Sequence, residues 1–292
     1  MDPQYSMNPG IRRMIARYLG QPEPQDDPTP SQQGTVEQAQ VGNQSVDGTN
    51  EFVDEGAAAT ATNVTNPPGL VGRVEVAFKY EDLPPMFKEG GIGYGIIVER
   101  SKTGRKTYQL NPYLRQKDAK VFGHNDIVVG AWFANRLIAL VCGAHGVNMR
   151  GIHGSDQGAF SIVVANDYKD FNQDEGDRLY YSAANSQLST DQQQPESSGG
   201  AKALKMSLET GLPVRVLRSG GAKSENRWLP VCGIRYDGLY RVTGVREKTN
   251  AIGGLYEQFI LDREPNQPPL EALRLASPTP QEQQDFAEFK QL

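Results

Sequence analysis

The sequence predicts an α+β protein built on a twisted, barrel-like mixed β-sheet with flanking helices. Short runs rich in β-branched and aromatic residues recur along the chain, and Gly, Asn or Asp separates most of them. Helices are also expected near 111–118 and 202–210, and a short helix is expected around 281–290. The runs expected to form strands are 71–79, 126–133, 135–143, 160–165, 178–182, 213–218, 239–245 and 255–262.

Composition divides the 292-residue chain into three parts. Residues 1–68 carry a net charge of −6 and, from residue 21 on, are rich in Gln, Asn, Thr, Pro and Gly. Such a segment buries too little apolar surface to offset the entropy of ordering, so we expect a mostly disordered acidic tail. Residues 69–264 form one expected folded domain, with a flexible loop at 195–201. Residues 265–292 form an expected Pro- and Gln-rich C-terminal tail, extended over 265–281.

A short amphipathic helix is expected at residues 9–19 of the acidic tail. Asn8 suits the N-cap and Pro9 the first turn, and apolar residues recur at helical spacing from Ile11 to Leu19. A helix of this length is unstable alone in water, so it needs a surface to pack on. Either it docks on its own domain or it binds a protein partner in a groove.

Cysteine and histidine are too few for a zinc-binding module. The chain has two cysteines, Cys142 and Cys232, three histidines and no Cys-x-x-Cys pair. This ligand count excludes zinc finger, RING and PHD modules, so we expect buried thiols, no metal and no cofactor. No apolar run approaches the ~20 residues of a membrane span, and the N-terminus has no apolar signal core. We therefore expect no membrane partner and an intracellular location.

Two tyrosines and neighbouring polar residues follow a strand of small and apolar residues. Two aromatic rings can stack on both faces of one base, which returns ~1–3 kcal/mol per base and offsets the few kcal/mol that extrusion costs. A carboxylate or an amide oxygen can accept a hydrogen bond from the N4 amino group of cytosine. The candidate base-binding residues are Tyr168, Tyr181, Asp170, Asn172, Ser182, Ala165 and Asp167.

Five ordered motifs over residues 121–264 resemble the SRA (SET and RING-associated, or YDG) domain family. The resemblance implies an SRA-like, PUA-like fold and a protein that flips methylated cytosine out of DNA. By motif position, Tyr168 and Tyr181 fall on the stacking aromatics and Ser182 on a pocket hydroxyl. With its short finger and lone domain the chain resembles fungal members. The motifs are the segment 121–132, Gly151-Ile-His-Gly154, Gly158-Ala-Phe-Ser-Ile-Val-Val-Ala165, Pro213-Val-Arg-Val216 and Arg235-Tyr-Asp-Gly238.

Further roles follow from the resemblance. Met149, two residues before Gly-Ile-His-Gly, is expected near the side chain that family members insert into the duplex gap. We expect His153 to brace its turn through hydrogen bonds and Asp237 to be a turn and network residue, so no catalytic residue is assigned. An acidic cluster, Asp174, Glu175 and Asp177, is interpreted as a solvated turn. Motif support is assigned to Gly151, His153, Gly154, Arg235, Tyr236, Asp237 and Gly238.

The sequence departs from the family pattern at three places. The segment 168–176 is one residue longer, so either Asp170, which we favour, or Asn172 reads the base edge. The segment 187–200 has no Lys or Arg, whereas members that read hemimethylated DNA carry a basic finger there, so the preferred methylation state stays open. Larger residues also replace the glycines of the family's pocket, namely Asn166, Asp167, Ala183 and Ala184.

The interpretation that accounts for most motifs is a non-catalytic reader of 5-methylcytosine that acts on methylated double-stranded DNA in the nucleus. One methyl group in an apolar niche predicts roughly a 5- to 100-fold preference over cytosine. Two alternatives stay open. One is an adaptor or scaffold protein with an altered pocket that binds partners through helix 9–19. The other is a modification-dependent nuclease subunit, because the family fold also occurs fused to nuclease domains.

Overall fold

The computed structural model describes residues 84–100, 106–112, 114–166, 171–195, 197–221 and 224–291. The predictions for the acidic tail, the helix at 9–19 and the strand at 71–79 lie outside these residues. In chain order the elements are η2 (Pro85–Phe87), β1 (Ile96–Arg100), β2 (Lys106–Leu110), β3 (Trp132–Phe133), α2 (Arg136–Val141), β4 (Ile152–Ser155), β5 (Gly158–Val164), β6 (Gln173–Asp174), β7 (Arg178–Ser182), α3 (Gly199–Thr210), β8 (Val214–Ser219), β9 (Ile234–Thr249), β10 (Leu255–Arg263), α4 (Leu270–Ala276) and α5 (Pro280–Gln291).

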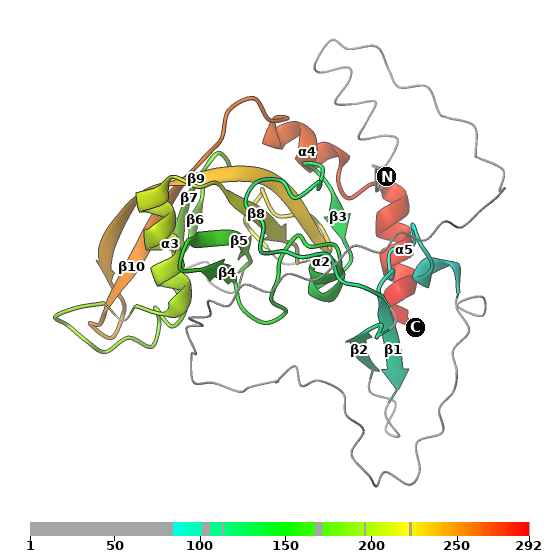
Figure 1. The fold of residues 1–292 in the computed structure, drawn as a ribbon, viewed down its shortest axis with the longest axis horizontal. Coiled ribbons are helices and arrows are strands. Elements are labelled where there is room, and N and C mark those ends of the chain that lie inside the picture. Colours follow the sequence, from blue (N-terminus) through cyan, green and yellow to red (C-terminus); the bar gives the residue numbers. More distant parts are fainter. Residues whose placement is uncertain are drawn as a thin grey trace, which may run out of the picture. The chain divides into compact units, whose positions relative to one another are not determined.

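An eight-stranded mixed sheet forms the centre of the domain (Figure 1). Its strands run in the order β4-β5-β8-β9-β10-β7-β6, and β3 adds to the end of β9. β5 and β8 are parallel, and the other pairs are antiparallel. β1 and β2 form a separate antiparallel pair. The α+β class and the mixed sheet predicted from the sequence are confirmed.

The sheet curls because its central strand is long and interrupted by bulges. β9 spans Ile234–Thr249, and its register shifts against β8 between Val216 and Leu217 and against β10 between Ile260 and Leu261. Bulges bend a strand and increase its twist. The two halves of the sheet therefore approach each other, and Tyr181 on β7 contacts the backbone of β5 across the interior. This is the barrel-like curvature expected from the sequence.

Both faces of the central strands are buried. All seven residues of β5 are buried, as expected of a strand with cover on both faces. Ile162 and Val164 belong to a core between the sheet halves and α3, whereas Val163 belongs to a second core. Because successive side chains of a strand point to opposite faces, this one strand joins the two cores. The second core also takes in side chains of α2, α4 and α5.

Four predicted strands and one predicted helix are confirmed near their expected bounds. The strands at 160–165, 178–182, 213–218 and 255–262 correspond to β5, β7, β8 and β10, and the strand at 239–245 is the middle of the longer β9. The helix at 202–210 is α3, which begins at Gly199 because the Ser198 hydroxyl accepts a hydrogen bond from Ala201 N. The flexible loop expected at 195–201 is therefore wrong for its last residues.

The strand expected at 135–143 is wrong, since Arg136–Val141 form α2. The Asn135 side chain caps this helix by accepting from Ile138 N, 3.1 Å away. Of the run 126–133, only Trp132–Phe133 are in a strand. Asn125 and Asp126 adopt left-handed backbone conformations, with φ of 53° and 51°, so the chain turns there. The helix expected near 111–118 is also wrong within the described residues of that stretch.

The C-terminal segment packs on the domain. The helix expected around 281–290 is confirmed as α5, but the extended segment expected at 265–281 contains α4. Leu270 and Leu273 of α4 and Phe289 of α5 are buried in the second core. The Phe289 ring stacks on Tyr108 of β2, with 5.1 Å between ring centroids. Residues 270–291 thus contribute core side chains, which corrects their interpretation as a tail.

Candidate base-binding site

The described residues on either side of the segment expected to hold the first stacking tyrosine form hydrogen bonds. Asp167, Tyr168 and Asp170 lie outside the described residues, so their predicted roles stay predictions. Before this segment, Asn166 Oδ1 accepts a hydrogen bond from Ser224 Oγ at 3.1 Å, and Ala165 is partly buried. After it, Phe171 O accepts bonds from Ser182 Oγ at 2.6 Å and from Gln258 Nε2 at 2.5 Å.

Tyr181 lies between the two halves of the sheet. Its side chain is 6% exposed and belongs to the core under α3. The hydroxyl lies 3.2 Å from both Gly151 O and Val163 O, to which it can donate. A Cβ atom at Gly151 would lie 2.6 Å from this hydroxyl, so only glycine fits there. Tyr181 and the Gly-Ile-His-Gly motif, 30 residues apart in sequence, are therefore in direct contact.

Asn172 and Ser182 bond to each other. Ser182 N donates to Asn172 Oδ1 at 2.8 Å, and the Ser182 hydroxyl donates to Phe171 O. The Asn172 amide oxygen, one of the two candidate readers of the base edge, thus already supports the backbone of β7. Which of Asp170 and Asn172 reads a base stays a prediction.

Met149 stands on a loop that is clamped at its base. Its side chain is 86% exposed, although methionine is apolar. Beside it, Arg150 O accepts hydrogen bonds from Arg136 Nη1 at 2.9 Å and pairs with His145 Nε2 at 2.9 Å. His145 Nδ1 lies 2.8 Å from Ser161 Oγ on β5. Burial lowers the pKa of His145 to about 3, so its ring is uncharged at neutral pH.

His153 is held by packing. Its ring lies 5.2 Å from the Phe160 ring, between centroids, and its Nδ1 is buried with no hydrogen-bond partner among the described residues. The hydrogen bonds by which His153 was expected to brace its turn are therefore not found at this atom. Burial lowers the pKa of His153 to about 4. A Cβ atom on the next motif residue, Gly154, would lie 2.6 Å from Ala203 Cβ, so glycine allows α3 to pack here.

The Arg-Tyr-Asp-Gly motif builds a buried ionic network. Asp237 lies between two fully buried arginines: its Oδ2 lies 2.8 Å from Arg218 Nη1 and 3.0 Å from Arg235 Nη2. Burial alone would raise the pKa of Asp237, but the charges of Arg235 and Arg218 lower it below its usual range. Tyr236 OH bonds to His124 Nδ1 at 2.8 Å. Asp237 is thus the shared carboxylate of a buried ionic network.

The network also includes residues that sequence reasoning missed. Asp174 forms two hydrogen bonds with Arg218, at 2.8 and 2.9 Å, and its side chain is 5% exposed. It is therefore a buried ion-pair partner, which corrects its assignment to a solvated turn. Arg215 is fully buried as well, and its hydrogen-bond partners among the described residues are backbone carbonyls, such as Gly123 O at 2.8 Å and Ala119 O at 2.7 Å. Its burial lowers its pKa to about 10, so it remains charged at neutral pH.

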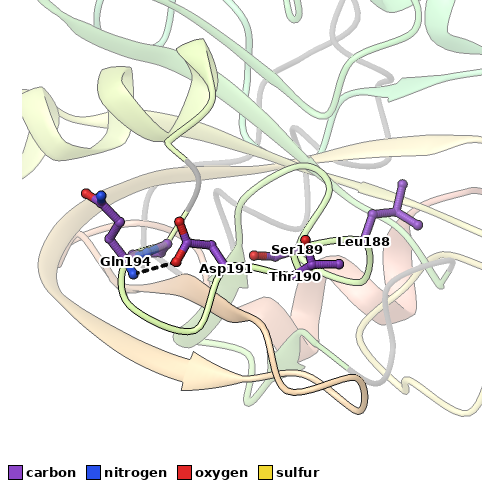
Figure 2. A pocket seen from close by; sticks show the side chains of 6 residues that line it. Leu188, Ser189, Thr190, Asp191 and Gln194 are labelled. Carbon is purple, nitrogen blue, oxygen red and sulfur yellow. Dashed lines mark hydrogen bonds between the residues drawn. The ribbon is translucent and has the colours of Figure 1, made fainter.

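Neither of two hollows found in the described part of the surface is lined by Tyr181. One, of about 330 Å³, lies in the loop after β7 (Figure 2). Its Asp191 accepts a hydrogen bond from Gln194 N at 3.1 Å, and its lining has no basic residue. The Asn250 side chain holds this loop by donating to Ser189 O at 2.8 Å. The second hollow is a groove of about 760 Å³ next to His153.

Neither a metal site nor a membrane-spanning helix is found in the described ranges. No three His, Cys, Asp or Glu side chains of those ranges come together in a way that could hold a metal ion. None of the helices there combines the length and apolar character needed to span a membrane. Both cysteines are free thiols, as expected, and both are partly buried.

Residues 121–267 match the protein family described as the SAD/SRA domain. A UHRF1-like protein of Cryptococcus neoformans var. grubii is 34% identical over 145 residues, 44% of this chain and 42% of that protein. The E3 ubiquitin-protein ligase ORTHRUS 2 of Arabidopsis thaliana is 34% identical over 139 residues, 44% of this chain and 21% of that protein. A solved complex of the SUVH5 SRA domain with hemimethylated CG DNA is 32% identical, covers 51% of this chain and 97% of that chain, and has a TM-score of 0.43. The matches thus span less than half the length of these two curated relatives.

Proposed function

Because the chain belongs to the SAD/SRA domain family, we propose that it is a non-catalytic reader of 5-methylcytosine in duplex DNA. It extrudes the modified base and holds it between Tyr168 and Tyr181. The proposed site of action is the nucleus, where such DNA occurs. ORTHRUS 2 is named a ubiquitin ligase, but the match covers 21% of it, and we propose no ligase activity for this segment.

The geometry around Tyr181 is the observation that supports this function most. Phe171, at the end of the segment that carries Tyr168, bonds through its carbonyl to Ser182, the neighbour of Tyr181. Three peptide units separate Tyr168 from Phe171, a reach of at most ~11 Å. In the proposed site the two rings stack on opposite faces of one base, and their stacking offsets the cost of extrusion.

Met149 supplies the complementary part of the proposed mechanism. A base that leaves the duplex leaves a gap, and an apolar side chain can fill it and keep the neighbouring base pairs apart. Met149 is exposed, and the clamp at Arg150 holds the base of its loop. In this proposal the inserting loop lies beside the base pocket, and the contact between Gly151 and Tyr181 supports that arrangement.

Affinities for matched duplexes test the proposal. Two duplexes of one sequence, with 5-methylcytosine or cytosine at one position, are titrated against the full chain by fluorescence anisotropy. The niche for one methyl group predicts a roughly 5- to 100-fold preference for the methylated duplex. Equal affinities would remove the reader function. Incubation of the protein with methylated plasmid and magnesium tests the nuclease alternative. A reader leaves the plasmid intact, whereas a nuclease cleaves it.

A further inference from the structure

The groove beside His153 carries excess positive charge. Its sides come from the segment before β3, from α2 and from β4. Three basic side chains, Arg115, Lys117 and Lys120, face one acidic side chain, Asp118. Lys117 pairs with Asp126, which is 76% exposed at its side chain and therefore well screened by water. The residues that line the groove are Arg115, Gln116, Lys117, Asp118, Ala119, Lys120, Leu140, Gly146 and His153.

A buried charge lies beneath the floor of this groove. Ala119 lines the groove, and its carbonyl oxygen accepts a hydrogen bond from Arg215 Nη2 at 2.7 Å. The guanidinium also donates to the carbonyls of Val121, Gly123 and Ala144. These dipoles satisfy its N–H groups but do not cancel its charge, in contrast to the carboxylates that face Arg218. The fixed charge of Arg215 therefore adds to the positive potential of the groove.

His153 offers the groove a hydrogen-bond donor. It is 8% exposed, and Nδ1 has no partner among the described residues. Because burial keeps the ring neutral, one nitrogen carries a proton and the other does not. When the proton is on Nε2, that N–H can donate a hydrogen bond to a ligand. A Cβ atom at Gly146 would lie 2.2 Å from His153 Cε1, so glycine lets the backbone pack close to this edge of the ring.

The groove and the proposed base pocket flank the same loop. Gly146 lies at the groove, Met149 at the exposed tip, and Gly151 against the Tyr181 hydroxyl. The five peptide units from Gly146 to Gly151 reach at most ~18 Å. Phosphates follow each other every ~3.4 Å along the axis of one DNA strand. A strand that runs past Met149 thus has phosphates within reach of the groove.

We propose that this groove binds a phosphate group of the DNA strand, through Arg115, Lys120 and the imidazole of His153, within a few nucleotides of the flipped base. The inference rests on the proposed function, because it names a further contact of the same DNA. A phosphate fits better than a carboxylate peptide, because its oxygens can meet two cations and the His153 donor at once.

The salt dependence of binding tests the contact. Each phosphate that a cation neutralises contributes about −0.9 to the slope of log K against log salt. Lys120→Gln and Arg115→Gln should each make the slope shallower by about that amount. They should also weaken binding to methylated and unmethylated duplexes by the same factor. Lys290→Gln on α5 removes one exposed charge elsewhere and serves as the matched control. If both groove variants keep the slope of the wild type, the proposal is wrong.

Nuclear magnetic resonance of the His153 side chain identifies the ligand. The proposal expects duplex DNA to shift the His153 signals, and expects Lys120→Gln to reduce that shift. Inorganic phosphate alone is the second arm. If it shifts His153 while DNA does not, the groove holds free phosphate and its role in DNA binding is overturned. A shift by a glutamate-rich peptide alone would overturn it in favour of a protein partner. Loss of methyl preference with an intact DNA-induced shift would instead contradict only the reader function.

Discussion

The hydroxyl group of Tyr181 on β7 donates a hydrogen bond to the backbone carbonyl of Val163 on β5, 3.2 Å away. Three strands, β8, β9 and β10, separate β5 from β7 in the sheet. The bond therefore spans the interior of the curled sheet rather than a neighbouring pair. One residue both closes the fold and, in the proposed function, forms a wall of the base pocket.

Two substitutions separate these roles of Tyr181. Tyr181→Phe keeps the ring and removes the hydroxyl, which should lower the free energy of unfolding by ~1 kcal/mol and preserve the methyl preference. Tyr181→Ala should cost ~3–5 kcal/mol and abolish the preference. Urea denaturation and duplex titration measure the two effects. A Phe variant as stable as the wild type would show that the hydroxyl does not hold the sheet halves together.

Removal of the Asp237 charge should destabilise the fold strongly. Asp237→Asn leaves Arg218 and Arg235 buried with less compensation, and breaking a buried ion pair costs ~3–5 kcal/mol. Asp262→Asn is the matched control. Its partner Arg178 is 51% exposed at the side chain, and such pairs contribute at most ~1 kcal/mol. Similar losses for the two variants in urea denaturation would contradict the network account.

Met149→Ala should weaken DNA binding without affecting stability. Burial of a methionine side chain in a duplex gap is worth ~1.5–3 kcal/mol, so we expect roughly a tenfold or larger loss of affinity for the methylated duplex. The thermal midpoint should not change, because the side chain is exposed in the free protein. Leu275→Ala on α4, also at an exposed apolar residue, is the control and should bind normally. Normal binding by Met149→Ala would argue against insertion.

Stability should fall as the pH is lowered from about 6.5. An unfolded histidine has a pKa of about 6.5, whereas burial lowers the pKa of His145 to about 3 and that of His153 to about 4. Between these values the unfolded chain binds protons that the folded chain does not, so each histidine removes up to ~1.4 kcal/mol per pH unit. Urea denaturation at pH 7, 6 and 5 measures the slope. His153→Gln should reduce this slope by the contribution of one histidine. An unchanged slope would contradict the lowered pKa of His153.

The strands were predictable where local pattern and burial agree. β5, β7, β8 and β10 are short apolar or alternating runs bounded by turn residues, and they lie near their expected bounds. The strand predicted over Arg136–Val141 was wrong, because the apolar residues of this run suit a strand or a helix equally well. The side-chain cap at Asn135 and packing in the second core favour the helix. Short apolar runs are decided by such tertiary contacts.

Motifs singled out Tyr181 and Gly151 separately, but no local pattern predicted the contact between them. The burial of Arg215 and Arg218 was not predictable, because an arginine is expected to be exposed unless its buried partners are known. Asp174 lies 44 residues before Arg218 and next to other acids, so no local signal marks it as a buried partner. Pairing over such distances is set by strand order.

The central claim is that one modified base leaves the helix and is held between two rings. A duplex with 2-aminopurine stacked beside the 5-methylcytosine reports this directly, because its fluorescence rises when the neighbouring base unstacks. The account predicts a rise on binding of the wild type and none with Tyr168→Ala at a concentration that saturates the duplex. Saturated binding of the wild type without any rise in fluorescence would contradict the account.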